Sequence, residues 1–323
     1  MKQALLALLM IGGCVHQETV NTSSDSISIR FQNMGGMTLG HGVCSILNYG
    51  GLDRLCHYSS TRPVDLFFEV GPGFTHVTSL VDVFDIPTQQ QERAVQWAEW
   101  QRLGARFYSV DPKDLAPSLE LFEAVTSKGA TERLSSNLKR RNNEFLFKPY
   151  LIVEVKGRRL AFLSLSDPKW NDPKAPWVVS DPVTAFQEAA AQIAADIPVL
   201  HVVGSIPPAI RASVAAVSQR PVVFFGGELK EMNSREIVAQ GLNNFWLKAP
   251  DIGRGVGEMV LSARPEAEGV AIGDLRYYYK PWVLAKPDTM SASCAALNPD
   301  NLAPGKCALS EVGKASCAQE IEK

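Results

Sequence analysis

Short apolar runs that alternate with helical patterns constrain the fold of this chain more than any other feature. Residues 64–70 read Val-Asp-Leu-Phe-Phe-Glu-Val and end at Gly71-Pro72-Gly73, which predicts a strand closed by a turn. Residues 89–103 then place Ala94, Trp97, Trp100 and Leu103 on one side of a predicted helix. A further short apolar run follows at residues 106–110. Strands that alternate with helices in this way predict a layered α/β fold.

The alternation continues through the body of the chain. We expect further strands at residues 27–31, 150–155, 159–166, 198–203, 221–225 and 275–284, with shorter strand-like pieces in 236–249 and 257–262. We expect helices at residues 116–128, from Asp181-Pro182 onward, and around residues 210–217. Near residue 286 the composition shifts to Ala, Ser, Pro, Asn and Cys. The sequence therefore predicts a body over residues 27–287 and a loop-rich tail over residues 288–323.

The first 14 residues predict export and lipidation. One positive charge at Lys2 is followed by an apolar run over residues 4–11 and by two glycines before Cys14. This run is too short to span a bilayer, which takes about 20 apolar residues. The segment resembles the bacterial lipobox, so we expect a signal peptide over residues 1–13, acylation of Cys14 and a lipidated linker over residues 14–26. Val15 favours the outer membrane of a bacterial envelope. The alternative is an ordinary buried cysteine in a first strand.

Charge and cysteine content narrow the function classes. The formal net charge of −2 argues against nucleic-acid binding. No Cys-x-x-Cys or Cys-x-x-Cys-His motif occurs, so zinc-ribbon, thioredoxin and c-type haem sites have no support. Beyond Cys14 the candidate disulfide cysteines are Cys44, Cys56, Cys294, Cys307 and Cys317. Cys44 with Cys56 would be a local bridge, but the sequence leaves the pairing open.

Five short segments, taken in order, resemble the metallophosphatase domain of secreted 5'-nucleotidases, which are calcineurin-like phosphoesterases. They are Gly50-Gly51-Leu52-Asp53-Arg54, Leu134-Ser135-Ser136-Asn137-Leu138, Pro149-Tyr150, the hairpin at Gly157, and Gly253-Arg254-Gly255-Val256-Gly257. The resemblance covers roughly residues 27–265 and implies a four-layer αββα sandwich, in which helices cover two central sheets.

The family's two-metal chemistry needs many oxygen and nitrogen ligands, and most of its ligand motifs are missing from this sequence. Met34 and Gly36 stand where the family has an Asp and a His, Pro72 replaces its bridging Asp, and Pro112 replaces its catalytic His. Its final Gly-His-x-His reads Gly226-Gly227-Glu228-Leu229 here. The vestigial-site candidates that remain are Asn33, Asp111, Asn137 and His201.

From this loss we predict a non-catalytic binding or scaffolding module without a cofactor, held on the membrane through its lipid and bound to another envelope protein. One alternative is an active phosphoesterase that holds a divalent metal in a rebuilt site around His41, Asp111 and His201. The alternative histidine ligands for a new metal site are His41, His76 and His201. A second alternative is an accessory protein of an extracytoplasmic redox system. The glycines at the strand ends could cradle a small anion, although turns alone explain them.

Overall fold

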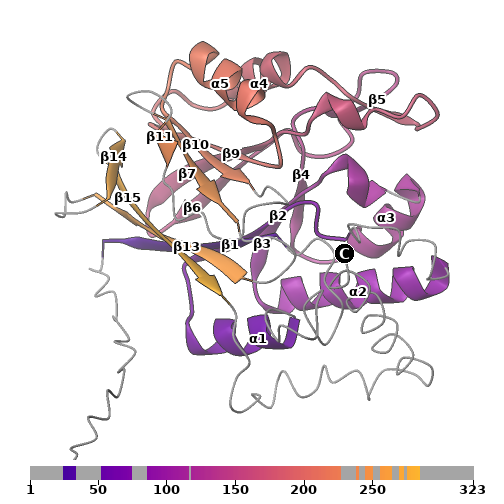
Figure 1. Ribbon diagram of the computed structural model, residues 1–323, viewed down its shortest axis with the longest axis horizontal. Helices are drawn as coiled ribbons and strands as arrows, with labels where there is room; N and C mark the ends of the chain where they lie inside the picture. Colours follow the sequence, from indigo (N-terminus) through magenta and orange to yellow (C-terminus); the bar gives the residue numbers. More distant parts are fainter. Residues whose placement is uncertain are drawn as a thin grey trace, which may run out of the picture.

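Two mixed β-sheets lie face to face at the centre of the molecule, with helices on both outer sides (Figure 1). The computed structural model describes residues 25–33, 52–74, 86–115, 118–226, 238–239, 244–249, 255–263, 269–272 and 275–283. The first sheet has the order β14-β15-β13-β1-β2-β3-β4 and the second has the order β11-β12-β10-β9-β7-β6. Within the described ranges, no helix has the length and apolar character that crossing a bilayer requires.

The first sheet joins distant parts of the chain. Its strands are β1 (Ile27–Gln32), β2 (Leu66–Val70), β3 (Ala105–Ser109), β4 (Glu132–Leu134), β13 (Gly255–Ser262), β14 (Val270–Ile272) and β15 (Leu275–Val283). Strands β1 to β4 run parallel, while β13 pairs antiparallel with β1. The period-two pattern of β1 sends Ile27, Ile29 and Phe31 into the space between the sheets.

The second sheet is built from β6 (Tyr150–Val155), β7 (Arg158–Ser164), β9 (Leu200–Val203), β10 (Val222–Gly226), β11 (Val238–Ala239) and β12 (Asn244–Lys248). Its four central strands are parallel, and antiparallel β6 and β11 form its edges. Residues of both sheets share one core, in which Phe31, Phe68, Phe162 and Phe225 meet. The sheets therefore pack directly on each other.

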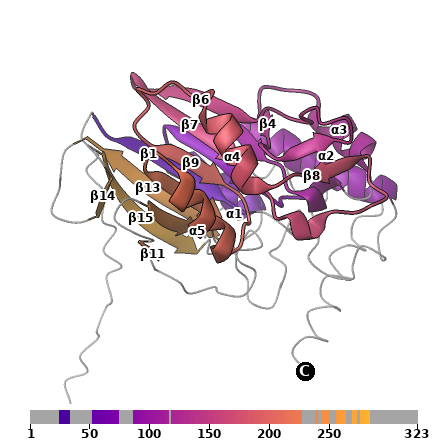
Figure 2. The same cartoon turned by 90° about the horizontal axis from the view of Figure 1, so that it is seen from above.

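Helices bury the outward faces of both sheets and complete four layers. The first sheet is covered by α1 (Leu52–Thr61), α2 (Ile86–Arg102) and α3 (Leu119–Thr126). The second sheet is covered by α4 (Pro182–Ala190) and α5 (Pro208–Val217), which Figure 2 shows lying over its strands. Asp181 caps α4 through the Thr184 amide, as the sequence predicts. The predicted α/β fold and its four-layer αββα arrangement are confirmed.

The buried side of α2 differs from the one that the sequence pattern indicates. Trp97 and Trp100 are buried, but Ala94 is exposed and Leu103 is only partly buried. Arg93, Gln96 and Glu99 are buried in their place. The reason is that α2 packs partly through polar contacts, which an apolar pattern does not record.

The three-residue strands of the described chain, which are β4, β14 and the two named next, escape prediction because three residues carry no period. Strands β5 (Leu138–Arg140) and β8 (Trp177–Val179) pair in a separate two-stranded sheet. Short 3₁₀ helices at η2 (Pro112–Leu115) and η3 (Pro168–Trp170) follow β3 and β7. Both 3₁₀ helices lie just after a strand of a central sheet, at the edge where a site is expected.

Candidate functional site

The parallel strands of both sheets end at adjoining edges, here called the carboxyl edge. Ligands of layered α/β folds gather at such strand ends. Hydrogen bonds of serine side chains join the two sheets at this edge. They include Ser109 Oγ with Ser164 Oγ at 2.7 Å, Ser166 Oγ to the Val110 carbonyl at 3.4 Å, and Ser205 Oγ to the Gly71 carbonyl at 3.3 Å. The space between the strand ends is thus bridged by the protein's own polar groups.

Glycines at three strand ends are packed against neighbouring backbone. A Cβ added at Gly71 would lie 2.1 Å from the Ser109 carbonyl oxygen, and one at Gly204 would lie 2.1 Å from the Leu165 carbonyl oxygen. At Gly226 the corresponding distance to the Gly204 carbonyl oxygen is 2.5 Å. These positions have no room for any side chain, and so none for a metal ligand.

Asp114 is the best-connected carboxylate of the carboxyl edge. It is fully buried in η2 and accepts hydrogen bonds from the Gly73 amide at 3.0 Å, the Phe74 amide at 3.1 Å and the Asp111 amide at 2.9 Å. The Tyr108 hydroxyl also bonds to it, and burial raises the pKa of Asp114. This carboxylate holds the loop after β2 against the loop after β3. Its role is therefore to order backbone.

Asp111, one of the four vestigial-site candidates, lies directly after β3. Its side chain is buried and accepts a hydrogen bond from the Lys113 amide at 3.0 Å. Burial, assisted by the neighbouring charge of Asp114, raises the pKa of Asp111 to about 7. Among the four vestigial-site candidates, all of which the structure describes, Asp111 is the one whose pKa lies near neutral pH.

Asn137 clamps the edge of the second sheet. Its side-chain NH₂ donates to the carbonyls of Ser166 at 2.9 Å and Ser180 at 3.1 Å, and its Oδ1 accepts from the Ser166 amide at 2.9 Å. The adjacent Ser136 and Ser164 exchange backbone and side-chain hydrogen bonds. The polar side-chain atoms of Asn137 are thus engaged with backbone, and its fully buried side chain fixes loops.

His201 lies away from the carboxyl edge. It is one of the vestigial-site candidates, but it is the second residue of β9 and its ring lies between the sheets. Nδ1 lies 3.0 Å from the Ala161 carbonyl oxygen, Nε2 lies 3.1 Å from the Tyr277 hydroxyl, and Phe162 stacks on the ring. Burial lowers the pKa of His201 to about 4. Both ring nitrogens therefore already have partners.

The remaining predicted residues fall at the margin of the described chain or outside it. Asn33 follows β1 and is buried. Beside it, both amide atoms of Gln32 are buried without a hydrogen-bond partner in the described structure. Cys14, His41, Cys44, His76, Cys294, Cys307 and Cys317 lie outside the described residues. Cys56 donates a hydrogen bond from its sulfur to Glu99 Oε1 at 2.6 Å. Its pairing with Cys44 stays a prediction.

The described residues do not fit the two-metal centre that the resemblance implies. Over the part of the chain that the structure describes, no group of three or more His, Cys, Asp or Glu could hold a metal ion. The oxygens of Asp114 are occupied by amides, Asn137 by backbone and His201 by the core. Asp111 alone cannot bind two cations. We derive no metal-dependent step from this donor set.

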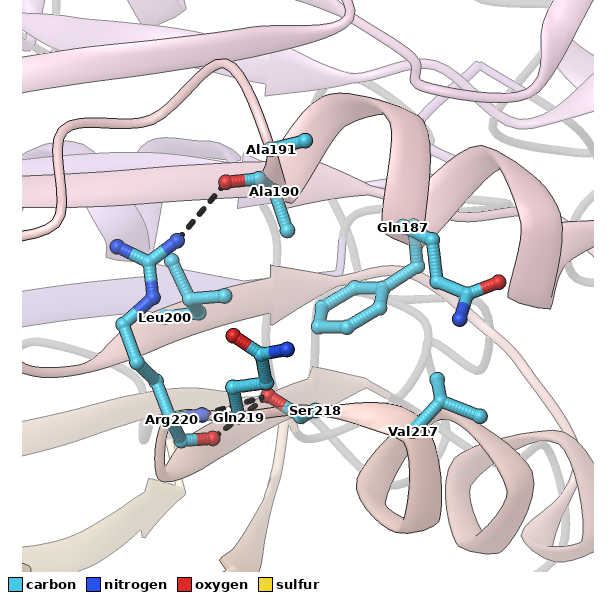
Figure 3. Close-up of a pocket in the computed structure, with 9 residues that line it drawn as sticks. Gln187, Ala190, Ala191, Leu200, Val217, Ser218, Gln219 and Arg220 are labelled. Atoms are coloured by element: carbon cyan, nitrogen blue, oxygen red, sulfur yellow. Dashed lines mark hydrogen bonds between the residues drawn. The ribbon is translucent and has the colours of Figure 1, made fainter.

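A cavity of about 210 Å³ lies at the opposite, amino end of the second sheet, between α4 and α5 (Figure 3). Phe186, Gln187, Leu200 and Val217 line it, together with Arg220. The Arg220 guanidinium donates to the carbonyls of Ala190, Ala194 and Ile197. The guanidinium of Arg220 therefore satisfies carbonyl groups at the end of α4 and in the turn that follows it.

The four layers, the two mixed sheets and their adjoining carboxyl edge form a fold that is similar to those of solved 5'-nucleotidases and of a calcineurin-like phosphoesterase. No protein-family profile and no curated protein matches the sequence. The fold is similar to solved structures of a 5'-nucleotidase precursor from Thermus thermophilus and of the calcineurin-like phosphoesterase YfkN from Bacillus subtilis. A third similar structure is the sulfate thiohydrolase SoxB from Thermus thermophilus in complex with glycerol.

These similarities are in structure far more than in sequence. The Thermus 5'-nucleotidase gives a TM-score of 0.57 at 16% identity, over 92% of this chain and 59% of its own. YfkN gives a TM-score of 0.60 at 11% identity, over 93% of this chain and 99% of its own. SoxB gives a TM-score of 0.62 at 15% identity, over 87% of this chain and 61% of its own. This chain thus spans about three fifths of the two Thermus proteins. At these identities the shared property is the fold.

Sequence reasoning missed the residues that organise the edge. Asp114 escapes it because this residue lies three positions after Asp111 in a segment without apolar period. Ser109, Ser164 and Tyr108 read only as strand residues. The available signal is position: polar residues at the ends of otherwise apolar strands face the site edge in layered folds.

Proposed function

We propose that this chain is a lipid-anchored protein of a bacterial cell envelope, sorted to the outer membrane, whose metallophosphatase-like domain binds or scaffolds a partner and catalyses no phosphoester hydrolysis. The observation that carries the proposal is the set of internal bonds at the carboxyl edge. Ser109 with Ser164, and Asp114 with three backbone amides, use groups that a metal-dependent enzyme would leave for ions and substrate.

The placement of His201 supports the same proposal. A rebuilt metal site with His41 and Asp111 would require this imidazole to reach the edge. Its ring instead lies between the sheets, bonded to Ala161 and Tyr277 and almost inaccessible to solvent. Turning it outward would leave two buried polar groups without partners, at a cost of about 1–3 kcal/mol each.

Metal content and hydrolysis test the non-catalytic part. The purified full chain would be assayed for bound Mn, Zn and Fe and for cleavage of nitrophenyl phosphate with added Mn²⁺. We expect less than stoichiometric metal and the same background rate in the wild type and in Asp111→Ala. Stoichiometric metal, together with turnover that Asp111→Ala abolishes, would overturn the proposal. A trace rate equal in both proteins supports it, because such a rate arises elsewhere.

A further inference from the structure

The cavity between α4 and α5 combines apolar walls with one positive charge. Its volume is about 210 Å³, and its lining includes Phe186 and Leu200, which are buried, and Val217, which is 37% exposed. An apolar cavity of about 150 Å³ can hold benzene, so this cavity has room for such a ring with a small polar group attached. Among the described residues that line it, Arg220 is the only charged one.

The charge of Arg220 has no carboxylate partner among the described residues. Its guanidinium donates from Nη1 to the carbonyls of Ala194 at 3.0 Å and Ile197 at 3.3 Å, and from Nη2 to the Ala190 carbonyl at 2.9 Å. These acceptors are backbone carbonyls, and the end of a helix carries only about half a negative charge. Burial lowers the pKa of Arg220, and no described carboxylate acts to raise it. The guanidinium therefore keeps part of its positive charge for an anion.

Two N–H groups of Arg220 remain for a further acceptor. A guanidinium has five N–H donors, and the bonds to the three carbonyls use three of them. Nε and Nη2 form one edge of the planar group, and such an edge matches the two oxygens of a carboxylate. The position of Arg220 is fixed, because Ser218 Oγ donates to its carbonyl at 2.6 Å and accepts from its amide at 3.3 Å. Figure 3 shows Arg220 on one side of the cavity and Gln187 and Val217 on the other.

We propose that this cavity binds a small monocarboxylic acid with an apolar ring, which places its carboxylate on Arg220 and its ring against Phe186 and Leu200. Mostly apolar walls with a few polar groups that orient the ligand are typical of small-molecule sites. One cation matches a single negative charge, which favours a carboxylate over a phosphate dianion. The site lies at the amino end of the second sheet, away from the carboxyl edge. It goes beyond the proposed function and does not depend on it.

Calorimetric titration of the full chain with sodium phenylacetate tests the site. We expect a dissociation constant in the millimolar range, because a ligand of this size has few atoms that contribute to binding. Phenylacetamide has the same ring and nearly the same shape without the charge, and acetate has the carboxylate without the ring. Each analogue should bind at least about tenfold more weakly than phenylacetate, because each lacks one of the two contacts.

Gln187→Glu and Gln192→Glu are a matched pair of variants. Both side chains are exposed, and both changes add a carboxylate of nearly the same size near the end of α4. Of the two residues, only Gln187 lines the cavity. Gln187→Glu should therefore weaken phenylacetate binding about tenfold by charge repulsion, whereas Gln192→Glu should bind as the wild type does. Arg220→Gln removes the positive charge and should weaken binding at least as much.

The proposal is overturned if phenylacetate does not bind at millimolar concentrations, if either analogue binds as tightly as phenylacetate, or if the two glutamate variants bind equally. Arg220 also holds the end of α4, so the folding of Arg220→Gln is checked by circular dichroism. If Arg220→Gln fails to fold, the comparison of Gln187→Glu with Gln192→Glu decides. Hydrolysis is not a readout, so the result is separate from the test of catalysis.

Discussion

At the scale of single residues, the buried His201 makes folding depend on pH. Its pKa is about 4 in the folded protein and near 6.5 in the unfolded chain, so the unfolded state binds more protons between these values. Stability should therefore fall as the pH drops from about 6.5 to 4, by about 3 kcal/mol from this residue. Urea unfolding of the wild type and His201→Gln at pH 7 and pH 4.5 measures it. Equal pH dependence in the two proteins would contradict the expectation.

Asp111 should change the pH dependence of stability in the opposite direction to His201. Burial raises its pKa to about 7 from an ordinary value of 3.8, so the folded state holds the extra proton in this window. Its contribution to stability is present below pH 3.8 and is lost as the pH rises toward 7. Asp111→Asn should therefore gain about 2–4 kcal/mol relative to the wild type between about pH 4 and pH 8, measured by urea unfolding.

Asp181→Asn is the control for Asp111→Asn. Asp181 caps α4 at the surface, and hydrogen bonds from Thr184 lower its pKa. Asp181→Asn should not gain stability relative to the wild type as the pH rises. Asparagine caps a helix about as well as aspartate, so the cap itself is kept. An Asp111→Asn curve parallel to the wild type would show that the carboxyl group is ionised throughout.

The same residues show which side-chain positions can be predicted from the sequence. Asn137 and Asp111 stand in the positions of family motifs, and the structure brings both to the carboxyl edge. His201 stands in such a position too but lies in the core. A motif match indicates which strand a residue belongs to, but it does not indicate toward which face of the sheet the side chain points. A shift of one residue along a strand turns the side chain to the other face.

At the scale of elements, close backbone contact between strand ends requires glycine at particular positions. Gly204 has a φ of +139°, and an added Cβ would lie 2.1 Å from the Leu165 carbonyl oxygen. Gly204→Ala should therefore lower the free energy of unfolding by about 3–5 kcal/mol through strain and overlap combined. Gly157→Ala is the control, since Gly157 also has a positive φ but open space at Cβ, and should cost about 1–2 kcal/mol. Chemical denaturation compares them, and equal losses would refute the packing argument.

The elements themselves are largely predictable from the sequence. The hairpin of β6 and β7, the strand β2 and the capped helix α4 follow from period, turn residues and capping residues. The pairing of β5 with β8 is not predictable, because three-residue strands carry no period. The buried polar side of α2 escapes prediction for another reason: Glu99 is stabilised by Arg102 and Cys56, and local propensity does not record such partners.

At the scale of the whole molecule, the sheet order could not be derived from local pattern. β1 pairs with β13, far along the chain, and that register depends on tertiary packing. The layer count follows from the resemblance, and the structure confirms it. The hydrogen bonds of Ser109, Ser166 and Ser205 join the two sheets through side chains at their adjoining edge.

In our proposal, an acyl group on Cys14 attaches the whole chain to a membrane. Each buried acyl methylene contributes about 0.8 kcal/mol, so a multiply acylated cysteine should keep the wild type in the membrane fraction through a high-salt wash. Cys14→Ala should move the protein to the soluble fraction or leave its signal segment uncleaved, while Cys307→Ser should fractionate as the wild type. Mass spectrometry of the mature N-terminus identifies the acylated cysteine directly. An unmodified Met1 on the membrane-bound wild type would rule out lipidation, because the apolar run over residues 4–11 would then still be attached to the mature chain.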